Sequence, residues 1–459
     1  MKGNNMFTRK KQGQLKCAIR LFAVVALVTG STDSADAANW FKLAGVSPAN
    51  APLVNFSGFF IPQYNYINGT KAANDQTPRI NLVGPQDTSS KSFNILFAHI
   101  MLRGNINKHI SYMLSGEFGN NAFTNIGGNY TPQLMDAHAT FSYIPGARIE
   151  VGVIRAPGAE EAMQGYPNFT FGFNYSMLVK QLILQPFYST NTMYTSGGNG
   201  SYSVPGTSIL GNNAFRYPGA EAMDWFRVGK MEYAYGIMVG NFGRTIGTNT
   251  SSGPLVAGRV QASYLLKGFG ADHGPFRSDL TGFLWYQHAN PNFDGSSYAM
   301  TREGLGVTYT QGYMHRWGRW AKFEYMRGTG MIEAPAVFNT YLAAPSTLTD
   351  AQVYPGSQNK ASGYYVSGGL FLTNRLELDM RYDFYDRLPN IASQERVYKT
   401  WAIGGQYHIT KFTKISVDYF VRNIRIPNLS SIPPAQRALS QSVAGAADNE
   451  LTISAFVAF

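Results

Sequence analysis

Cysteine is almost absent from this sequence of 459 residues: its one cysteine, Cys17, lies near the amino terminus, before the apolar core of an expected signal peptide. The rest of the chain therefore has no disulfide, no thiolate metal site and no cysteine-attached haem. After the first 37 residues the sequence lacks any apolar run of 18 residues, which excludes a membrane protein built from helices.

Motifs for catalysis and for cofactors are also missing. The seven histidines show no metal-ligand spacing, and there is no nucleophile elbow or phosphate-cradling glycine motif. The basic excess is modest, so nothing in the composition indicates a nucleic-acid partner. We therefore expect no metal, no cofactor and no enzymatic activity.

The first 37 residues have the features of a secretory signal peptide. Residues 1–20 carry six basic side chains and no acidic one, and the short apolar run LFAVVALV follows. The stretch ends in ADAA, the small-residue pattern of a cleavage site. We expect residues 1–37 to be removed, which lowers the net charge from +11 to +7, and residues 38–459 to form one barrel domain. The alternative is a first helix buried in the fold.

The composition favours many short strands. Aromatic residues make up 14% of the chain, with 28 tyrosines and 30 phenylalanines, and there are 48 glycines. Charged residues are only 14%, and the mean hydropathy is −0.18. Bacterial outer-membrane barrels have such a composition, because their strands carry apolar outward positions and aromatic girdles.

Apolar and polar residues alternate with a period of two, as in a strand with one apolar face. The segment LELDMRYDFY places leucine, methionine and aromatic residues on one face and charged residues on the other, and KISVDYFVR repeats this pattern. The final segment, LTISAFVAF, alternates up to an aromatic last residue, as in the terminal strand by which outer-membrane barrels are recognised for insertion. The alternative is a soluble β-sandwich or propeller, whose strands alternate too.

The spacing of turn signals gives a strand count. Six short connections and one longer one, residues 267–278, alternate with long polar stretches, as short periplasmic turns alternate with long outer loops in a barrel. Their residues are 105–109, 144–147, 228–230, 267–278, 314–318, 372–375 and 408–412. With a first strand at VNFSGFFIPQYNY and the final strand, we predict an all-β fold, a transmembrane antiparallel β-barrel of about 16 strands, with 18 as the alternative.

One connection, residues 156–218, is unusually long and apolar for a solvated loop. We expect it to fold into the lumen and to narrow the pore. The alternative is a cap on the outer rim or a contact within a trimer. The charged residues of this connection that we expect to line the constriction are Glu160, Glu161, Lys180 and Arg216.

About 60 residues resemble a known family. The segments are RGNINKHISYMLSGEF and PQLMDAHATFSYIPGARIEVGVIRAPGAEE, with a short turn, a Pro-Gly turn and a glutamate just beyond VGVIRAP. They resemble the phosphate-selective porin O/P family of Gram-negative outer-membrane channels. The resemblance implies a 16-stranded trimer that takes up small anions passively through a constriction of inward-folded loops. In that family an arginine ladder and loop lysines carry selectivity, and no motif here reproduces them.

The alternation assigns almost equal numbers of acidic and basic side chains to the luminal face. In the structural interpretation, each charged side chain forms a salt bridge within the barrel wall. The functional interpretation is that a subset faces the open path and sets selectivity. The candidates are Arg103, Arg259, Lys322 and Arg422, followed by Arg381, Lys414 and Lys230.

Two functional hypotheses follow. The first is a porin of the Gram-negative outer membrane, a homotrimer in contact with lipid and lipopolysaccharide, that passes small polar or anionic solutes, including phosphate-like ones. The second is an occluded or occupied barrel that serves as a scaffold or sheath for a periplasmic or outer-membrane electron-transfer partner. The apolar 156–218 segment argues against a sheath, because a sheath needs a wide bore.

Overall fold

The computed structural model describes most of the chain after residue 50. The described residues are 51–67, 90–121, 124–126, 129–164, 174–183, 215–242, 253–266, 277–293, 296–333, 354–445 and 449–459. The expected signal peptide, residues 1–37, lies outside them.

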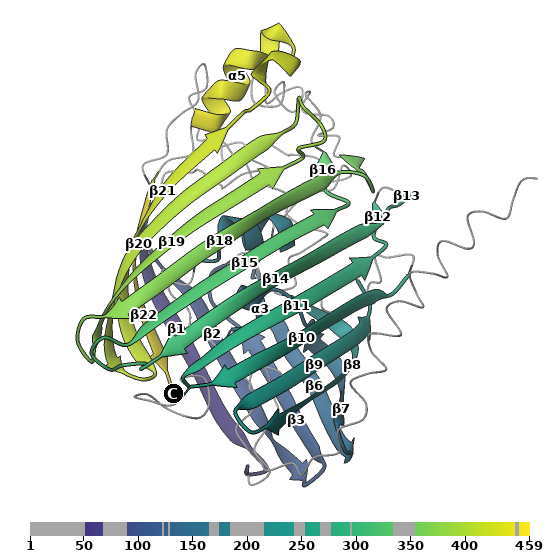
Figure 1. Cartoon of the computed structure of the whole chain (residues 1–459), viewed down its shortest axis with the longest axis vertical. Coiled ribbons are helices and arrows are strands. Elements are labelled where there is room, and N and C mark those ends of the chain that lie inside the picture. Colours follow the sequence, from purple (N-terminus) through teal and green to yellow (C-terminus); the bar gives the residue numbers. More distant parts are fainter. Residues whose placement is uncertain are drawn as a thin grey trace, which may run out of the picture.

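Sixteen antiparallel strands form one closed barrel (Figure 1). Each strand pairs with its neighbours in the sequence, and β22 pairs with β1 to close the ring. The strands are β1 (Asn55–Ile67), β2 (Ser90–Asn107), β3 (Ile110–Glu117), β6 (Gln133–Ile144), β7 (Ala147–Arg155), β8 (Arg216–Val228), β9 (Met231–Gly240), β10 (Leu255–Leu265), β11 (Asp279–Ala289), β14 (Met300–Gln311), β15 (Arg319–Thr329), β18 (Lys360–Phe371), β19 (Leu376–Arg387), β20 (Arg396–Thr410), β21 (Thr413–Arg425) and β22 (Glu450–Ala458). The prediction of a 16-stranded barrel is confirmed, and 18 strands are excluded.

The two ends of the barrel differ as the turn signals predict. At one end short turns join β2 to β3, β6 to β7, β8 to β9, β14 to β15, β18 to β19 and β20 to β21. At the other end lie the long connections, which contain short paired strands and helices. These elements are β4 (Asn125–Ile126), β5 (Asn129–Tyr130), β12 (Asn292–Phe293), β13 (Ser296–Ser297), β16 (Ile332–Glu333), β17 (Tyr354–Pro355), α3 (Glu160–Met163), η4 (Val179–Ile183), η7 (Leu429–Ser431) and α5 (Pro434–Gly445).

The helices are short. None of those in the described residues is long and apolar enough to cross a membrane.

Alternation along each strand sorts side chains between lipid and lumen. In β19, Leu378 and Met380 are exposed on the outer face, whereas Asp379 and Arg381 are buried on the inner face. Placing these charges inside avoids the cost of a charged group in lipid, which is about 2–4 kcal/mol for an arginine at the midplane. The outward apolar band and the closed ring make this chain a transmembrane barrel of the outer-membrane type.

Two tryptophans depart from the expected aromatic girdle. Trp285 and Trp320 face the lumen and donate their indole N–H groups to the carboxylates of Glu324 and Glu377, respectively. An indole N–H needs a hydrogen-bond partner when it is buried, and the inner wall supplies carboxylates that the lipid face lacks.

The strand that closes the barrel is fixed by its last residue. Phe459 exchanges two backbone hydrogen bonds with Gly58 of β1, both of 3.0 Å. A Cβ at Gly58 would lie 2.6 Å from the carbonyl oxygen of His99 and 2.7 Å from the Phe459 ring, so this seam requires glycine. The pairing of β1 with β2 shifts register between Ile61 and Pro62, which places the proline at a bulge as its missing N–H predicts.

Candidate channel constriction

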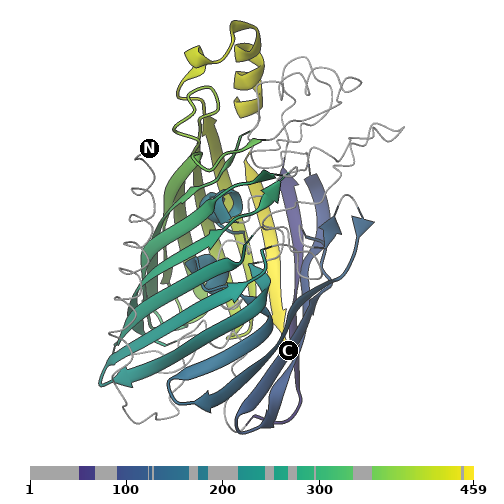
Figure 2. The same ribbon diagram turned by 90° about the vertical axis from the view of Figure 1, so that its right-hand side faces the viewer.

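The connection after β7 folds into the lumen. Figure 2 shows the short helices α3 and η4 inside the ring of strands. The described parts of this connection, 156–164 and 174–183, contact inward-facing residues of β10, β14, β15 and β19. The predicted inward fold is therefore confirmed for these parts, and 165–173 and 184–214 lie outside the described residues.

The first anchor holds the start of α3 against β10 and β15. Arg259 of β10 forms an ion pair of 2.5 Å with Glu160 and donates to the carbonyl oxygen of Gly158 at 2.7 Å. Glu324 of β15 accepts the backbone N–H of Glu160 at 3.1 Å and the indole N–H of Trp285 at 2.8 Å. Because Glu324 is fully buried, these donors replace the water that its carboxylate would otherwise need.

The second anchor holds the segment before η4 against β19. Arg381 donates to the carbonyl oxygens of Asn174 at 2.9 Å and Tyr175 at 3.3 Å, and it pairs with Glu161 at 3.4 Å and with Asp383 at 2.9 Å. Glu161 also accepts hydrogen bonds from the backbone N–H and the hydroxyl of Ser176. These contacts compensate a charged cluster that is almost fully buried.

Burial raises the pKa of Glu161 above its ordinary value of 4.5. The nearby Arg381 and the hydrogen bonds from Ser176 lower this pKa, but burial is the larger effect, and Asp383 adds to it. Docking against β19 therefore makes Glu161 easier to protonate than it is in water.

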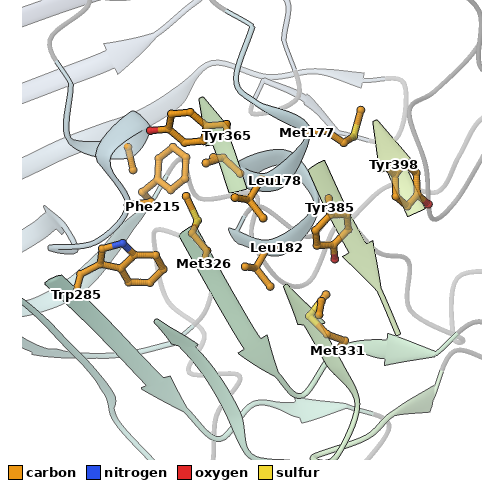
Figure 3. Packing of buried hydrophobic residues seen from close by; sticks show 14 of the residues in the cluster. Met177, Leu178, Leu182, Phe215, Trp285, Met326, Met331, Tyr365, Tyr385 and Tyr398 are labelled. Atoms are coloured by element: carbon orange, nitrogen blue, oxygen red, sulfur yellow. The ribbon is translucent and has the colours of Figure 1, made fainter. Parts of the chain in front are cut away.

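A hydrophobic contact completes the docking. Leu178 and Leu182 are fully buried and lie among Met326, Met331 and Tyr385 (Figure 3). Two inward glycines on neighbouring strands make room for them. A Cβ at Gly363 would lie 2.9 Å from a methyl carbon of Leu178, and a Cβ at Gly328 would lie 2.9 Å from one of Leu182.

The segment also reaches the opposite wall. Tyr175 packs against the Leu178 cluster, which includes Phe215, and against a separate cluster on β1, β2, β6 and β22 that contains Phe59 and Phe456. Its ring meets that of Phe215 edge-on, with centroids 5.5 Å apart. The inward segment therefore crosses the lumen instead of lining one side of it.

Lys180 of η4 lies within electrostatic range of Arg381 and Asp383 on β19. Its amine lies within electrostatic range of Glu450 and Arg422, which form a 3.7 Å ion pair between β21 and β22. It also approaches the side-chain oxygen of Asn174 at 3.4 Å. Burial lowers the pKa of Lys180, with Glu450 and Asp383 acting in the opposite direction. The inward segment thus brings the amine of Lys180 near charged side chains of β19, β21 and β22.

Several predicted pore residues lie on the inner wall in different surroundings. Arg103 is half-buried on β2. Lys322 of β15 lies 4.9 Å from the centre of the Trp320 ring, and four carboxylates act on its amine: Glu160, Glu161, Glu377 and Asp379. Lys414 is buried on β21 near Glu377 and Asp418. Of the predicted set, Arg259 and Arg381 hold the inward segment, as described above.

Two predicted positions need correction. Lys230 lies in the exposed turn between β8 and β9, beside Tyr264, because the chain reverses there before the luminal alternation begins. Arg216 is the first residue of β8 and not part of the connection. Its guanidinium is buried and binds both carboxylate oxygens of Asp136 on β6, at 2.6 and 3.1 Å.

The sequence analysis missed two inward arginines that bind backbone groups of the segment. Arg302 of β14 donates to the carbonyl oxygen of Leu182 at 2.7 Å, and Arg155 of β7 donates to that of Ala162 at 2.8 Å. The alternation in β14 places Arg302 inward, so the period-two pattern was an available signal for this residue. Its partner is a main-chain group, which no sequence pattern identifies.

Among the described residues, no group of three or more histidine, cysteine, aspartate or glutamate side chains is placed to hold a metal ion.

Comparisons with known proteins establish the fold. No protein-family model matches the chain, and no curated protein matches it in sequence. Among solved structures, Salmonella typhi OmpF in complex with daunomycin has a TM-score of 0.50 and 15% identity, covering 88% of this chain and 97% of OmpF. The fold is that of an outer-membrane porin.

Two further structures are similar at lower scores. An anion-selective porin from Comamonas acidovorans has a TM-score of 0.48 and 12% identity, covering 88% of this chain and 99% of that porin. The outer-membrane channel DcaP of Acinetobacter baumannii has a TM-score of 0.47 and 11% identity, covering 91% of this chain and all of DcaP.

Proposed function

We propose that the protein is a channel of the Gram-negative outer membrane for passive diffusion of small polar solutes, with a weak preference for anions. The observation that carries this proposal is the position of Lys180, which lies on the inward segment within electrostatic range of the Arg422–Glu450 pair on β21 and β22. A charge held at the narrowest part of a pore acts on every ion that passes.

The charges around this position support weak selectivity and oppose specificity for phosphate. Arg216, Arg259 and Arg381 each bind carboxylates and so do not form a free ladder of cations. The resemblance to the phosphate-selective porin family therefore supports small anions as the class of solute, and it does not support phosphate as the specific substrate. The homotrimer remains a prediction, which cross-linking of the protein in membranes would test.

The proposal is tested by conductance of the purified protein in a planar bilayer, with the reversal potential measured under a KCl gradient. We expect steady conductance with a modest preference for chloride. Lys180→Glu changes the local charge by two units and should lower the chloride-to-potassium permeability ratio by about threefold. The matched control is Lys230→Glu, which makes the same charge change in an exposed turn and should leave the ratio unchanged.

Absence of conductance from a folded, heat-modifiable barrel would overturn the proposal. It would favour a closed barrel that acts as a scaffold, for which the contact of Tyr175 with both luminal clusters is the specific observation. The sheath form of that scaffold has less support. The inward segment occupies space that an inserted electron-transfer partner would need.

A further inference from the structure

The short-turn end of the barrel carries cationic side chains and no exposed acidic side chain in the part that the structure describes. The described turns are 108–109, 145–146, 229–230, 312–318, 372–375 and 411–412. Their charged side chains, all exposed, are Lys108, Lys230, Arg316, Arg375 and Lys411. The nearest carboxylates, those of Glu232, Asp279 and Glu377, are buried toward the lumen beside Arg277 or His408.

The long-connection end does not share this bias. Both signs occur together there, as in Glu395, Arg396 and Asp386 at the β19–β20 connection. A single sign at one end is therefore a local property and does not simply repeat the net positive charge of the chain.

Two cations of this set, together with Arg319 at the start of β15, lie beside aromatic side chains on the outward strand faces or in a turn. The Lys230 amine lies 3.4 Å from the Tyr264 hydroxyl and 5.6 Å from the centre of its ring. Arg316 lies over the exposed Trp317 ring at 5.1 Å. The Nε of Arg319, at the start of β15, donates to the hydroxyl of Tyr309 at 3.4 Å.

These pairs mark a level in the membrane. Outward aromatic rings in a barrel lie where the acyl chains meet the headgroups. A guanidinium or ammonium group beside such a ring therefore lies at the depth of the lipid phosphates. Short turns face the periplasm, so this level belongs to the periplasmic leaflet.

We infer that the outer surface formed by Lys230, Tyr264, Tyr309, Arg316, Trp317 and Arg319 binds anionic phospholipid headgroups of the periplasmic leaflet. Charge complementarity favours this occupant, since clustered cations at a membrane surface attract anionic lipids. The adjacent outer face supplies the apolar contact for the acyl chains, with Leu280, Leu305 and Val307 exposed on β11 and β14. This inference does not depend on conduction through the lumen.

The test uses the full-length protein in vesicles whose phosphatidylcholine or phosphatidylglycerol carries bromine on the acyl chains, because bromine quenches nearby tryptophan. In a Trp401→Phe variant, Trp317 is the remaining tryptophan exposed on the described outer face; in Trp317→Phe, Trp401 on β20 takes that role. We expect quenching of Trp317 to show about a threefold preference for phosphatidylglycerol, and that of Trp401 to show none.

The preference at Trp317 should disappear in the triple variant Lys230→Gln, Arg316→Gln, Arg319→Gln and should weaken in high salt. The matched control is Arg327→Gln, which removes an exposed cation on the outer face near the long-connection end. Equal quenching of Trp317 by both lipids at low salt would overturn the inference. So would a preference that survives the triple variant, which would indicate that these cations do not contact the headgroups.

Discussion

Two long connections leave the same end of the barrel and lie in different places. The one between β7 and β8 enters the lumen, where its described parts are fixed to the wall (Figure 2). The one between β21 and β22 forms α5, which lies beyond the strand ends (Figure 1).

The two connections differ in where their buried polar groups find hydrogen-bond and ion-pair partners. Arg259, Glu324 and Arg381 on the inner wall offer charges and hydrogen bonds that match Glu160, Glu161 and main-chain groups of the inward connection. The outer connection satisfies its own groups: Arg437 donates to the carbonyl oxygens of Ser430 and Ile432. A connection enters a lumen when the wall can satisfy the polar groups that it buries.

The largest expected effect comes from removing one wall partner. Arg381→Leu leaves Glu161 and Asp383 buried without their cation, and loss of one partner from a buried ion pair costs about 3–5 kcal/mol. The inward segment should undock, which would raise single-channel conductance and make its described parts, 156–164 and 174–183, accessible to protease. Denaturant unfolding of the reconstituted barrel measures the loss of stability.

The connection between β21 and β22 provides a matched control for Arg381→Leu. Arg437→Leu removes an arginine of the outer connection whose bonds lie within that connection, so conductance should stay at the wild-type level. If Arg381→Leu also left conductance and protease resistance unchanged, the buried charges would not be what holds the segment.

A smaller effect is expected from filling the space on the inner wall into which η4 packs. In Gly328→Ala the new methyl would meet carbons of Arg302 and Leu182 at 2.8 and 2.9 Å, and such overpacking costs about 1–3 kcal/mol. Conductance should become noisier, because the segment would undock from the wall more often. Gly445→Ala in α5 is the matched control, since its methyl would meet nothing within 4 Å. Equal noise in the two variants would argue against the contact between η4 and Gly328 as a determinant of docking.

The smallest effect is a pH dependence confined to the inward connection. Because burial raises the pKa of Glu161, protonation favours the docked segment. Docking is strongest below the ordinary pKa of 4.5 and weakens as the pH rises through the raised pKa. Channel noise should therefore increase from pH 4 to pH 7, and Glu161→Gln should flatten this dependence. An increase that persists in Glu161→Gln would assign it to another group.

The barrel was predictable from the sequence for a physical reason. A strand between lipid and lumen must alternate, and a charged residue such as Asp379 can only face inward, so the pattern in β19 is visible in one dimension. The short turns carry Gly, Asn and Pro and mark the hairpins, which gave the strand count. The inward fold of the 156–218 connection followed from its apolar composition.

The roles of the candidate site residues were not predictable in the same way. The alternation assigned Arg259 and Arg381 to the lumen, and the sequence analysis interpreted them as selectivity residues. In the structure both hold the inward segment. Their partners are 99 and 207 residues away, at Glu160 and Asn174, and no local pattern connects residues so distant.

The sequence by itself determined which face of each strand meets lipid, how many strands there are and which connection is apolar enough to be buried. These properties depend on the order of residues along one strand or one loop. Only the tertiary structure decided which luminal charges bind the inward segment, and that Lys180 lies within electrostatic range of Glu450 and Arg422. The closed ring brings β10, β15 and β19 around one segment, and that juxtaposition exists only after the barrel has closed.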